Sequence, residues 1–152
     1  MNIFYLHQDP ETCSKYHVDK HVVKMILETA QLLSTTHWVS GGEGPYRQTH
    51  KNHPSAIWAR SNKSNYVWLC ELGMELCKEY THRYGKIHKT QQHLEWLSTN
   101  IPNIPDGEFT QPTLAMPEQY KSDDHIQSYR LYYIKDKSHL HSWKNREIPE
   151  FI

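Results

Sequence analysis

The sequence predicts a mostly α-helical protein, a single compact helical domain over residues 1–152 with an N-terminal apolar arm and long irregular loops. Apolar residues recur at spacings of three and four along the longer segments, as they do on one face of a helix. Glycine and proline gather between those segments, where they interrupt regular structure. A length of 152 residues is usual for one domain and can bury a core without disulfides.

The N-terminal part begins with an apolar run and continues into a long helix. Residues 2–6 are expected as a strand or a buried arm, and Asp9-Pro10 has the residue types of a helix start. The expected helix extends through about Thr36. Its apolar face consists of Val22, Val23, Ile26, Leu27, Ala30 and Leu33.

The middle of the chain alternates polar loops with helices. The glycine-rich segment 41–45 ends the first pattern, and the polar segment 46–62 is expected as a loop or short helical turns. A second long helix is expected from Asn65 to a stop at Gly85, and a shorter one around residues 87–97.

The C-terminal part begins with an irregular segment. Four prolines and Gly107 exclude regular structure between residues 102 and 117, in a loop long enough to be a lid or a surface wrap. A last helix is expected after Ser122, and residues 143–152 form an aromatic tail. The apolar residues expected to carry this last helix are Ile126, Tyr129, Tyr133 and Leu140.

Composition limits the classes of function. Lysine plus arginine and aspartate plus glutamate are balanced at 17 each, so any DNA binding must come from a local patch. Three cysteines without CxxC spacing are expected as reduced thiols, and no apolar run is long enough for a membrane helix. A cytoplasmic protein is expected. The 12 histidines, 10 tyrosines and 5 tryptophans favour a polar site with aromatic faces.

A histidine- and lysine-rich segment on the first helix is the sharpest local signal. His17 and His21 are four residues apart and therefore share a helix face, as do Lys20 and Lys24. Two histidines at this spacing can chelate a metal. The alternative interpretation is the solvated face of an amphipathic helix. We expect no bound metal and no cofactor, because no third ligand stands at a diagnostic spacing.

Two further features are candidates for substrate binding or acid–base chemistry. The segment from His50 to Tyr66 combines hydrogen-bonding side chains with aromatic rings, as a pocket for a nucleobase or phosphate requires. Its candidate binding residues, together with His17, are Asn52, His53, Trp58, Arg60, Asn62 and Tyr66. The alternative is a turn at His53-Pro54 with Trp58 in the core. Glu28 lies one turn beyond Lys24 and is either a catalytic carboxylate or an exposed helix residue.

Taken in order, these elements resemble the pyrimidine-dimer DNA glycosylases of phages and algal viruses, which are small helical enzymes with an N-terminal arm and an aromatic tail. The segment Lys20-His21-Val22-Val23-Lys24 is similar to that family's charged segment in its early helix. The stretch from His53-Pro54 to Arg83-Tyr84-Gly85 resembles the family's proline-initiated segment and its long helix. The resemblance covers about two thirds of the chain.

The resemblance implies an amine nucleophile that attacks the sugar C1′, loss of the base and elimination from the resulting imine. That family uses the free amine of a small residue exposed by removal of the initiator methionine, whereas Asn2 here usually leaves Met1 attached, so the amine would be that of Met1. The family's catalytic glutamate would fall near His21, so His21 or Glu28 must replace it. Lys20 or Lys24 would supply the amine only if desolvation or a neighbouring positive charge lowered its pKa.

The sequence therefore favours an enzyme that acts on a nucleobase or glycosidic bond in DNA, with DNA or a nucleotide as partner. Two alternatives remain open at this point. One is a metal-dependent hydrolase that uses His17, His21 and either His50 or His53 as ligands. The other is a nucleic-acid or host-protein binding module without catalytic activity. The oligomeric state does not follow from the sequence.

Overall fold

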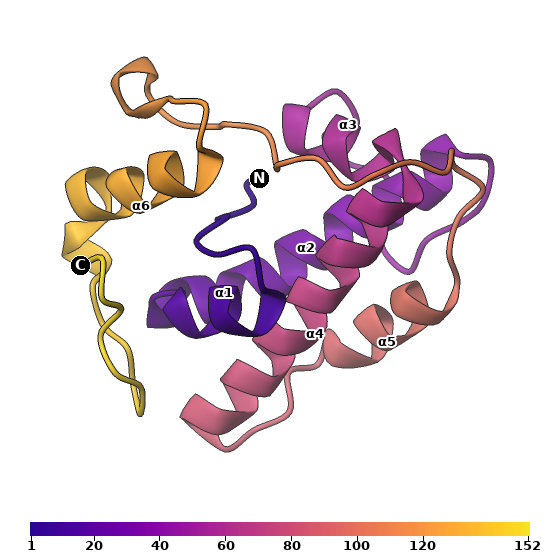
Figure 1. Ribbon diagram of the computed structural model, residues 1–152. Coiled ribbons are helices and arrows are strands. Elements are labelled where there is room, and N and C mark those ends of the chain that lie inside the picture. The colour runs from indigo at the N-terminus through magenta and orange to yellow at the C-terminus, as the bar shows by residue number, and fades with distance from the viewer.

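The computed structural model describes residues 1–152, and its regular structure is entirely helical, as the sequence predicts (Figure 1). The α-helices are α1 (Pro10–Tyr16), α2 (Asp19–Val39), α3 (Pro54–Ser61), α4 (Lys63–Tyr84), α5 (Gln91–Thr99) and α6 (His125–Asp136). Two short 3-10 helices, η1 (Glu118–Tyr120) and η2 (Ser138–Leu140), follow the long irregular segment and α6.

Helices α2 and α4 cross at the centre of the molecule, and α4 also packs against α1, α3 and α5 (Figure 1). Gly73 permits the close approach of α4, because a Cβ there would lie 2.8 Å from Leu94 of α5 and 3.1 Å from Thr29 of α2. One cluster of 28 buried apolar residues includes side chains from the N-terminal arm and from α1 to α6.

The ends of several helices follow from local residue types. Asp9, Asn62 and Asp124 each accept a backbone N–H from the first turn of the helix that follows. Gly85 ends α4 in the left-handed conformation, with a φ of 67°. Asp9, Gly85 and the start of the last helix were identified correctly from these signals.

The expected first helix is in fact two helices, separated at His17 and Val18. Residues that are distant in the sequence stabilise this break. The backbone N–H of Val18 donates to the hydroxyl of Tyr133 at 3.2 Å, and Arg83 donates to the carbonyl of His17 at 2.8 Å. Backbone groups that a continuous helix would pair internally are satisfied here by residues of α4 and α6.

Two other boundaries also differ from expectation. The polar segment after residue 46 contains a full helix, α3, which begins at Pro54 and buries Trp58. The last helix ends at Asp136, and Leu140 belongs to η2 instead. Lys137 and His141 flank that short turn. The apolar spacing in the sequence therefore extended one turn beyond the end of the helix.

The apolar run at the N-terminus is a buried arm rather than a strand. Ile3, Phe4, Tyr5 and Leu6 are each at most 5% exposed. The arm lies between α2 and α6 in Figure 1, and the guanidinium of Arg130 in α6 donates to the carbonyl of Leu6 at 2.9 Å. The arm is therefore fixed on both sides by helices.

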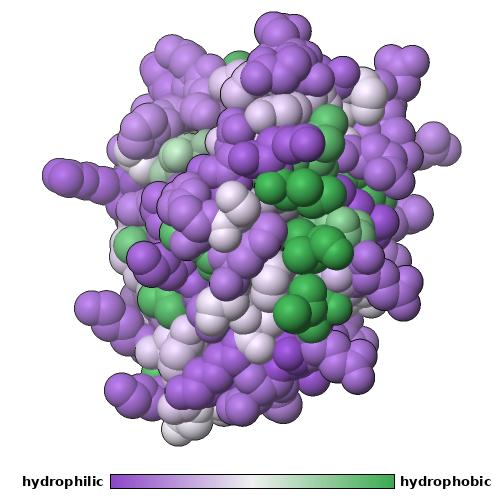
Figure 2. Space-filling view, turned by 90° about the vertical axis from the view of Figure 1, so that its left-hand side faces the viewer, coloured by the Kyte–Doolittle hydropathy of each residue, from purple (hydrophilic) through white to green (hydrophobic).

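The tail after α6 returns to α4 through a buried ion-pair network. Glu79 accepts from Arg83 at 2.9 Å and from Arg146 of the tail at 2.6 Å. Figure 2 shows the side of the molecule that carries α6 and the tail, which is mostly hydrophilic with a short band of hydrophobic side chains. No helix in the structure is long and apolar enough to cross a membrane.

Candidate active site

The α-amine of Met1 lies 3.3 Å from Oε1 of Glu28 in α2, whose side chain is 12% exposed. The side chain of Met1 is only 5% exposed, although the residue as a whole is half-buried. Most of the solvent-exposed surface of Met1 therefore belongs to its main chain. The methionine side chain thus anchors the terminus, and the amine lies beside a carboxylate.

The arm runs antiparallel to α2, which fixes where the amine lies. The ring of Phe4 stacks on His21 with centroids 4.2 Å apart, while Met1 contacts Glu28. Three extended residues span about 10 Å, which matches the rise of two helical turns between His21 and Glu28. His21 is therefore about 10 Å from the amine, and Glu28 is the carboxylate beside it.

Lysines of α2 flank the amine. The ammonium of Lys24 lies 3.6 Å from Oε2 of Glu28, and its side chain is 72% exposed. Oε2 is itself buried and accepts no hydrogen bond. Lys20, one turn earlier, is also exposed. Both lysine side chains are therefore open to solvent.

A hollow of about 540 Å³ opens beside Glu28. Its floor is Val23 and Leu27, which the sequence suggested as core residues but which are 40% and 39% exposed. The remaining lining residues are Lys24, Glu28, Tyr46, His88, Lys89 and Thr90. A lining with apolar side chains, a tyrosine, a histidine and two lysines suits a planar, partly polar ligand attached to phosphate.

Two loops far apart in the sequence build the walls of the hollow. The hydroxyls of Tyr46 and Thr90 lie 3.0 Å apart, which joins the segment after α2 to the segment before α5. A Cβ on Gly44 would lie 2.6 Å from the backbone of Ser34, so only glycine lets this loop pack on α2. The backbone N–H of Tyr46 then donates to Ser34 at 3.3 Å.

His53, in the polar segment, is influenced by the charges of the N-terminus and of Glu28. It caps α3, and its Nδ1 accepts the backbone N–H of Ser55 at 3.0 Å, which leaves a proton for Nε2. Burial, reinforced by the positive charge of the N-terminus, holds the pKa of His53 below its usual range. A neutral imidazole with a free N–H therefore stands near Met1 and Glu28.

A second hollow of about 420 Å³ continues along α2 and shares Val23 with the first. Tyr80, Tyr84, Lys86 and Lys144 complete its lining, and the ammonium of Lys144 lies 5.2 Å from the centre of the Tyr84 ring. Together with Lys24 and Lys89, two more lysines thus form a basic groove. We use that name for the two hollows and their four lysines.

His17 and His21 are buried rather than displayed on a solvated face. Nδ1 of His17 donates to the carbonyl of Cys13 at 2.7 Å, and its Nε2 has no partner. Nδ1 of His21 lies 2.7 Å from the hydroxyl of Tyr133. Burial lowers the pKa of His17 to about 4 and that of His21 to about 3, so both rings are neutral at neutral pH.

The ligand set of the hydrolase alternative is not assembled. His17 and His21 each bind a protein partner through Nδ1, and His50 is an exposed residue of the loop before α3. The structure contains no group of three or more histidine, cysteine, aspartate or glutamate side chains arranged to hold a metal ion. All three cysteines are free and buried.

Most other candidate binding residues of the polar segment serve the fold. Trp58 is 5% exposed and donates to Thr110 at 3.1 Å, while Tyr66 is fully buried and donates to the carbonyl of Leu97 at 2.8 Å. Asn62 caps α4. Arg60 donates to the carbonyl of Lys51 at 2.6 Å, and Asn52 is an exposed loop residue. The structure does not bring these five residues together at the amine.

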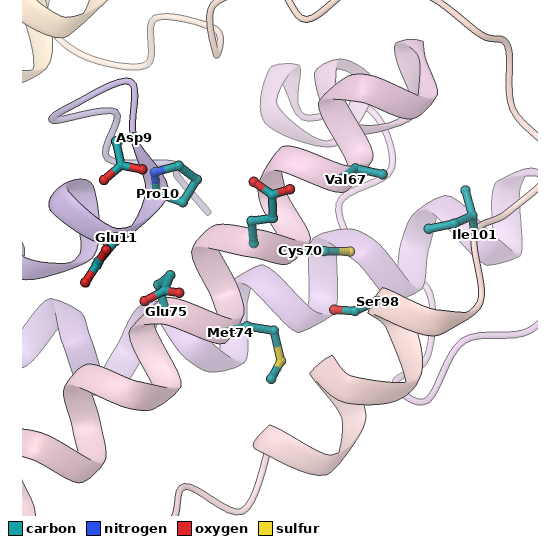
Figure 3. A pocket seen from close by; sticks show the side chains of 10 residues that line it. Asp9, Pro10, Glu11, Val67, Cys70, Met74, Glu75, Ser98 and Ile101 are labelled. Carbon is teal, nitrogen blue, oxygen red and sulfur yellow. The ribbon is translucent and has the colours of Figure 1, made fainter.

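Another pocket, of about 450 Å³, lies between α1, α4 and the end of α5 (Figure 3). Four carboxylates stand around it, from Asp9, Glu11, Glu71 and Glu75. Repulsion between these carboxylates and phosphates makes this pocket unsuitable for a nucleic-acid backbone. The basic groove, which contains the contact partner of the Met1 amine, is the better candidate for the active site.

A family model described as pyrimidine dimer DNA glycosylase matches residues 1–94, well over half of the chain. The chain belongs to the pyrimidine dimer DNA glycosylase family. The match includes the arm, α1 to α4 and the start of α5, and with them Met1, Lys24, Glu28 and His53. No curated protein and no solved structure matches the chain.

Membership of this glycosylase family agrees with the resemblance seen in the sequence, but the hollow beside Glu28 was missed. Tyr46, His88, Lys89 and Thr90 are scattered through loops and have no shared spacing. The available signal was weak: an aromatic residue directly after the glycine-rich turn at residues 41–45, and a His-Lys-Thr segment before α5.

Proposed function

We propose that this protein is a DNA glycosylase for pyrimidine dimers, with AP lyase activity, whose nucleophile is the α-amine of Met1. The observation that carries the proposal is the contact of that amine with Glu28 at 3.3 Å, beside a hollow with a cationic rim. Family membership supports a DNA substrate, and the geometry supports this amine over Lys20 and Lys24.

The proposed reaction begins when the neutral amine attacks C1′ of the damaged nucleotide. A bond forms between the nitrogen and C1′, the glycosidic bond breaks, and the base leaves with its bonding electron pair and takes up a proton. Loss of a proton from nitrogen and opening of the sugar ring give an imine. Removal of a proton from C2′ then expels the 3′ phosphate and cleaves the strand.

Glu28 has two roles in this proposal. Its Oε1 accepts a proton from the amine, which frees the lone pair for attack. Once the imine nitrogen is positively charged, the same carboxylate stabilises it across a short distance. Oε2 is buried and makes no hydrogen bond, so Oε1 is also proposed to accept the C2′ proton.

His53 and Lys24 are proposed to assist. A neutral imidazole with a free N–H can donate to the leaving base or to a sugar oxygen. Lys24 is exposed at the rim and is placed to bind a phosphate after releasing Glu28. His21, which is buried against Phe4 and Tyr133, is proposed to support the arm rather than to contact the substrate.

DNA is proposed to bind along the basic groove. Lys24, Lys86, Lys89 and Lys144 line this side, whereas carboxylates line the pocket in Figure 3. A protein of zero net charge that neutralises phosphates through a local set of lysines should bind DNA weakly and with strong dependence on salt. The hollow of about 540 Å³ supports binding of a nucleotide turned out of the duplex.

Covalent trapping tests the proposal directly. Borohydride added while the protein acts on ultraviolet-irradiated DNA reduces the imine to a stable protein–DNA adduct. Peptide mapping by mass spectrometry should locate the link at the nitrogen of Met1. Glu28→Gln should slow adduct formation at saturating DNA by ~100-fold, with little change in DNA affinity.

The controls separate this chemistry from adventitious reactions, since exposed amines react slowly with abasic sugars. Lys78→Ala removes an exposed lysine beside the acidic pocket and should leave trapping unchanged. An adduct that maps to Lys20 or Lys24 would overturn the role of Met1. Folded protein that forms no adduct with irradiated DNA and does not cleave its strand at dimers would overturn the glycosylase proposal.

We also propose that residues 1–152 act as one domain in the cytoplasm. One core with side chains from the arm and all six α-helices supports a single folding unit. Three unpaired cysteines support a reducing compartment.

A further inference from the structure

Asn2 is adjacent to the proposed nucleophile, and both polar atoms of its side chain take part in hydrogen bonds. Its Oδ1 accepts the backbone N–H of Ile3 at 2.8 Å and lies 3.1 Å from the hydroxyl of Tyr129. Its Nδ2 donates to the carbonyl of Ala115 at 3.2 Å. A residue of this kind at the start of a chain is normally free in solvent, so such complete pairing is unusual.

Tyr129 is the centre of this arrangement. The residue is fully buried in α6, and its hydroxyl proton is shared between Asn2 and the carbonyl of Thr113. The same hydroxyl accepts the backbone N–H of Ala115 at 3.3 Å. One phenol therefore joins α6, the irregular segment before it and the second residue of the chain.

The same irregular segment also reaches α3. The hydroxyl of Thr113 donates to the carbonyl of Pro54 at 3.4 Å, directly after His53. Met1 is followed by Asn2 and His53 is followed by Pro54, and both Asn2 and Pro54 form hydrogen bonds with segment 113–115. That segment is thus one residue away from each of the two groups proposed to work together, the Met1 amine and the His53 imidazole. None of that segment, nor Tyr129, lies within the part of the chain that the family model matches.

We propose that Asn2 and Tyr129 are positioning residues: they clamp the N-terminus so that the Met1 amine stays beside Glu28. This inference rests on the proposed role of the amine as nucleophile. It gives the C-terminal third of the chain a specific task, because Tyr129, Thr113 and Ala115 supply the fixed side of the clamp.

The physical reason lies in the mobility of chain ends. An unanchored terminal residue samples many backbone conformations, and only a few would place its amine within reach of C1′ and Glu28 together. Displacement of a reacting group by about 1 Å can reduce a rate ~100-fold. Two hydrogen bonds that tie the neighbouring residue to Ala115 and Tyr129 reduce this search, while the side chain of Met1 packs against the core.

The test compares tyrosines of the same helix. Tyr129→Phe removes one hydroxyl and keeps the ring, so it removes the clamp with little change in packing. Tyr132→Phe is the matched control, since Tyr132 is half-buried in the same helix and its hydroxyl makes no hydrogen bond in the structure. Asn2→Asp is a second variant, which loses the donor to Ala115 and keeps an acceptor.

The readout is the rate constant of borohydride trapping at saturating irradiated DNA, measured beside DNA affinity and thermal unfolding. Tyr129→Phe should lower the trapping rate at least ~10-fold with DNA affinity nearly unchanged, and Tyr132→Phe should behave as the unaltered protein. Tyr66→Phe corrects for stability, because it removes a fully buried hydroxyl that binds Leu97 and His37, away from the arm. Equal losses for Tyr129→Phe and Tyr66→Phe, or no loss for Tyr129→Phe, would overturn the clamp.

A measurement without DNA distinguishes failure of the clamp from failure of the proposed function. Reductive methylation by formaldehyde and a mild hydride labels free α-amines, and mass spectrometry follows the labelling of Met1. Release of the terminus from Glu28 should speed this labelling severalfold in Tyr129→Phe but not in Tyr132→Phe. If the protein forms no DNA adduct yet shows this difference, the clamp stands and the glycosylase proposal fails.

Discussion

Phe4 stacks on His21 with ring centroids 4.2 Å apart and ring planes inclined by 14°. This contact sets the register of the arm along α2, because each residue by which the arm slipped would move Met1 about 3.4 Å along the helix. Phe4 also packs edge-on against Tyr129, so it joins the arm to both of its supports.

We expect Phe4→Ala to lower both stability and activity. Loss of a buried phenylalanine should reduce the free energy of unfolding by about 3–5 kcal/mol. The trapping rate of the protein that remains folded should also fall, since the amine loses its register. Chemical denaturation and borohydride trapping measure the two effects. Leu97→Ala, at a buried site of α5 outside the arm, should lower stability alone; equal activity losses in both variants would contradict the register argument.

The basic groove predicts which lysines bind DNA. Lys24→Ala, Lys89→Ala and Lys144→Ala should each weaken binding and reduce the slope of log affinity against log salt by about 1. Lys78→Ala should change neither quantity, because Lys78 pairs with Glu75 beside the acidic pocket. Fluorescence anisotropy at several salt concentrations measures both. A groove variant with an unchanged slope would exclude that lysine from phosphate contact.

The buried histidines predict sensitivity to acid. The folded state holds the pKa of His17 at about 4 and that of His21 at about 3, against 6.5 for a free side chain. The unfolded state therefore binds more protons than the folded state between pH 6.5 and 4, and the free energy of unfolding falls as pH falls through this window. At pH 5 the loss should be of order 2 kcal/mol for each histidine.

Urea unfolding at pH 7, 6 and 5 measures this loss, and a variant identifies its source. His21→Gln keeps a hydrogen-bonding group near Tyr133 but cannot titrate, so its stability should depend less steeply on pH. Glu79 does not interfere in this window, because its arginine partners hold its pKa below the usual 4.5 and its contribution is lost only in stronger acid. An unchanged slope in His21→Gln would rule out His21 as the source.

The helices could be predicted from sequence wherever the deciding signals are local. Apolar spacing identified the long helices, and Asp9, Gly85 and the aspartates before α6 gave their ends. The break between α1 and α2 could not be predicted in this way. It depends on Tyr133 and Arg83, which reach Val18 and His17 from 115 and 66 residues away.

The same distinction applies to the candidate site. Met1, Lys24 and Glu28 were identified as candidates because each residue type has a chemical role in amine catalysis, and His53 was identified as a candidate for substrate binding. Which of Glu28 and His21 would stand beside the amine depended on the register of the arm, which Phe4 and Asn2 set through contacts with α2 and α6. Trp58 and Tyr66 have suitable side chains for stacking on a base, yet the core needs them.

The position of the amine itself yields the last prediction. A variant with one glycine in front of Met1, released from a fusion by a protease, moves the α-amine by about 3.8 Å while every side chain of the arm is kept. Since Met1 remains packed and Asn2 remains clamped, folding and DNA affinity should be unchanged. The trapping rate should fall at least ~100-fold, because the displaced amine no longer meets Glu28 and C1′ together. The control is the same fusion cut so that Met1 is the first residue, with intact mass confirming both products. Full activity in the glycine-extended protein would show that the nucleophile is not the amine beside Glu28, and a lysine would then have to be sought by mapping the adduct.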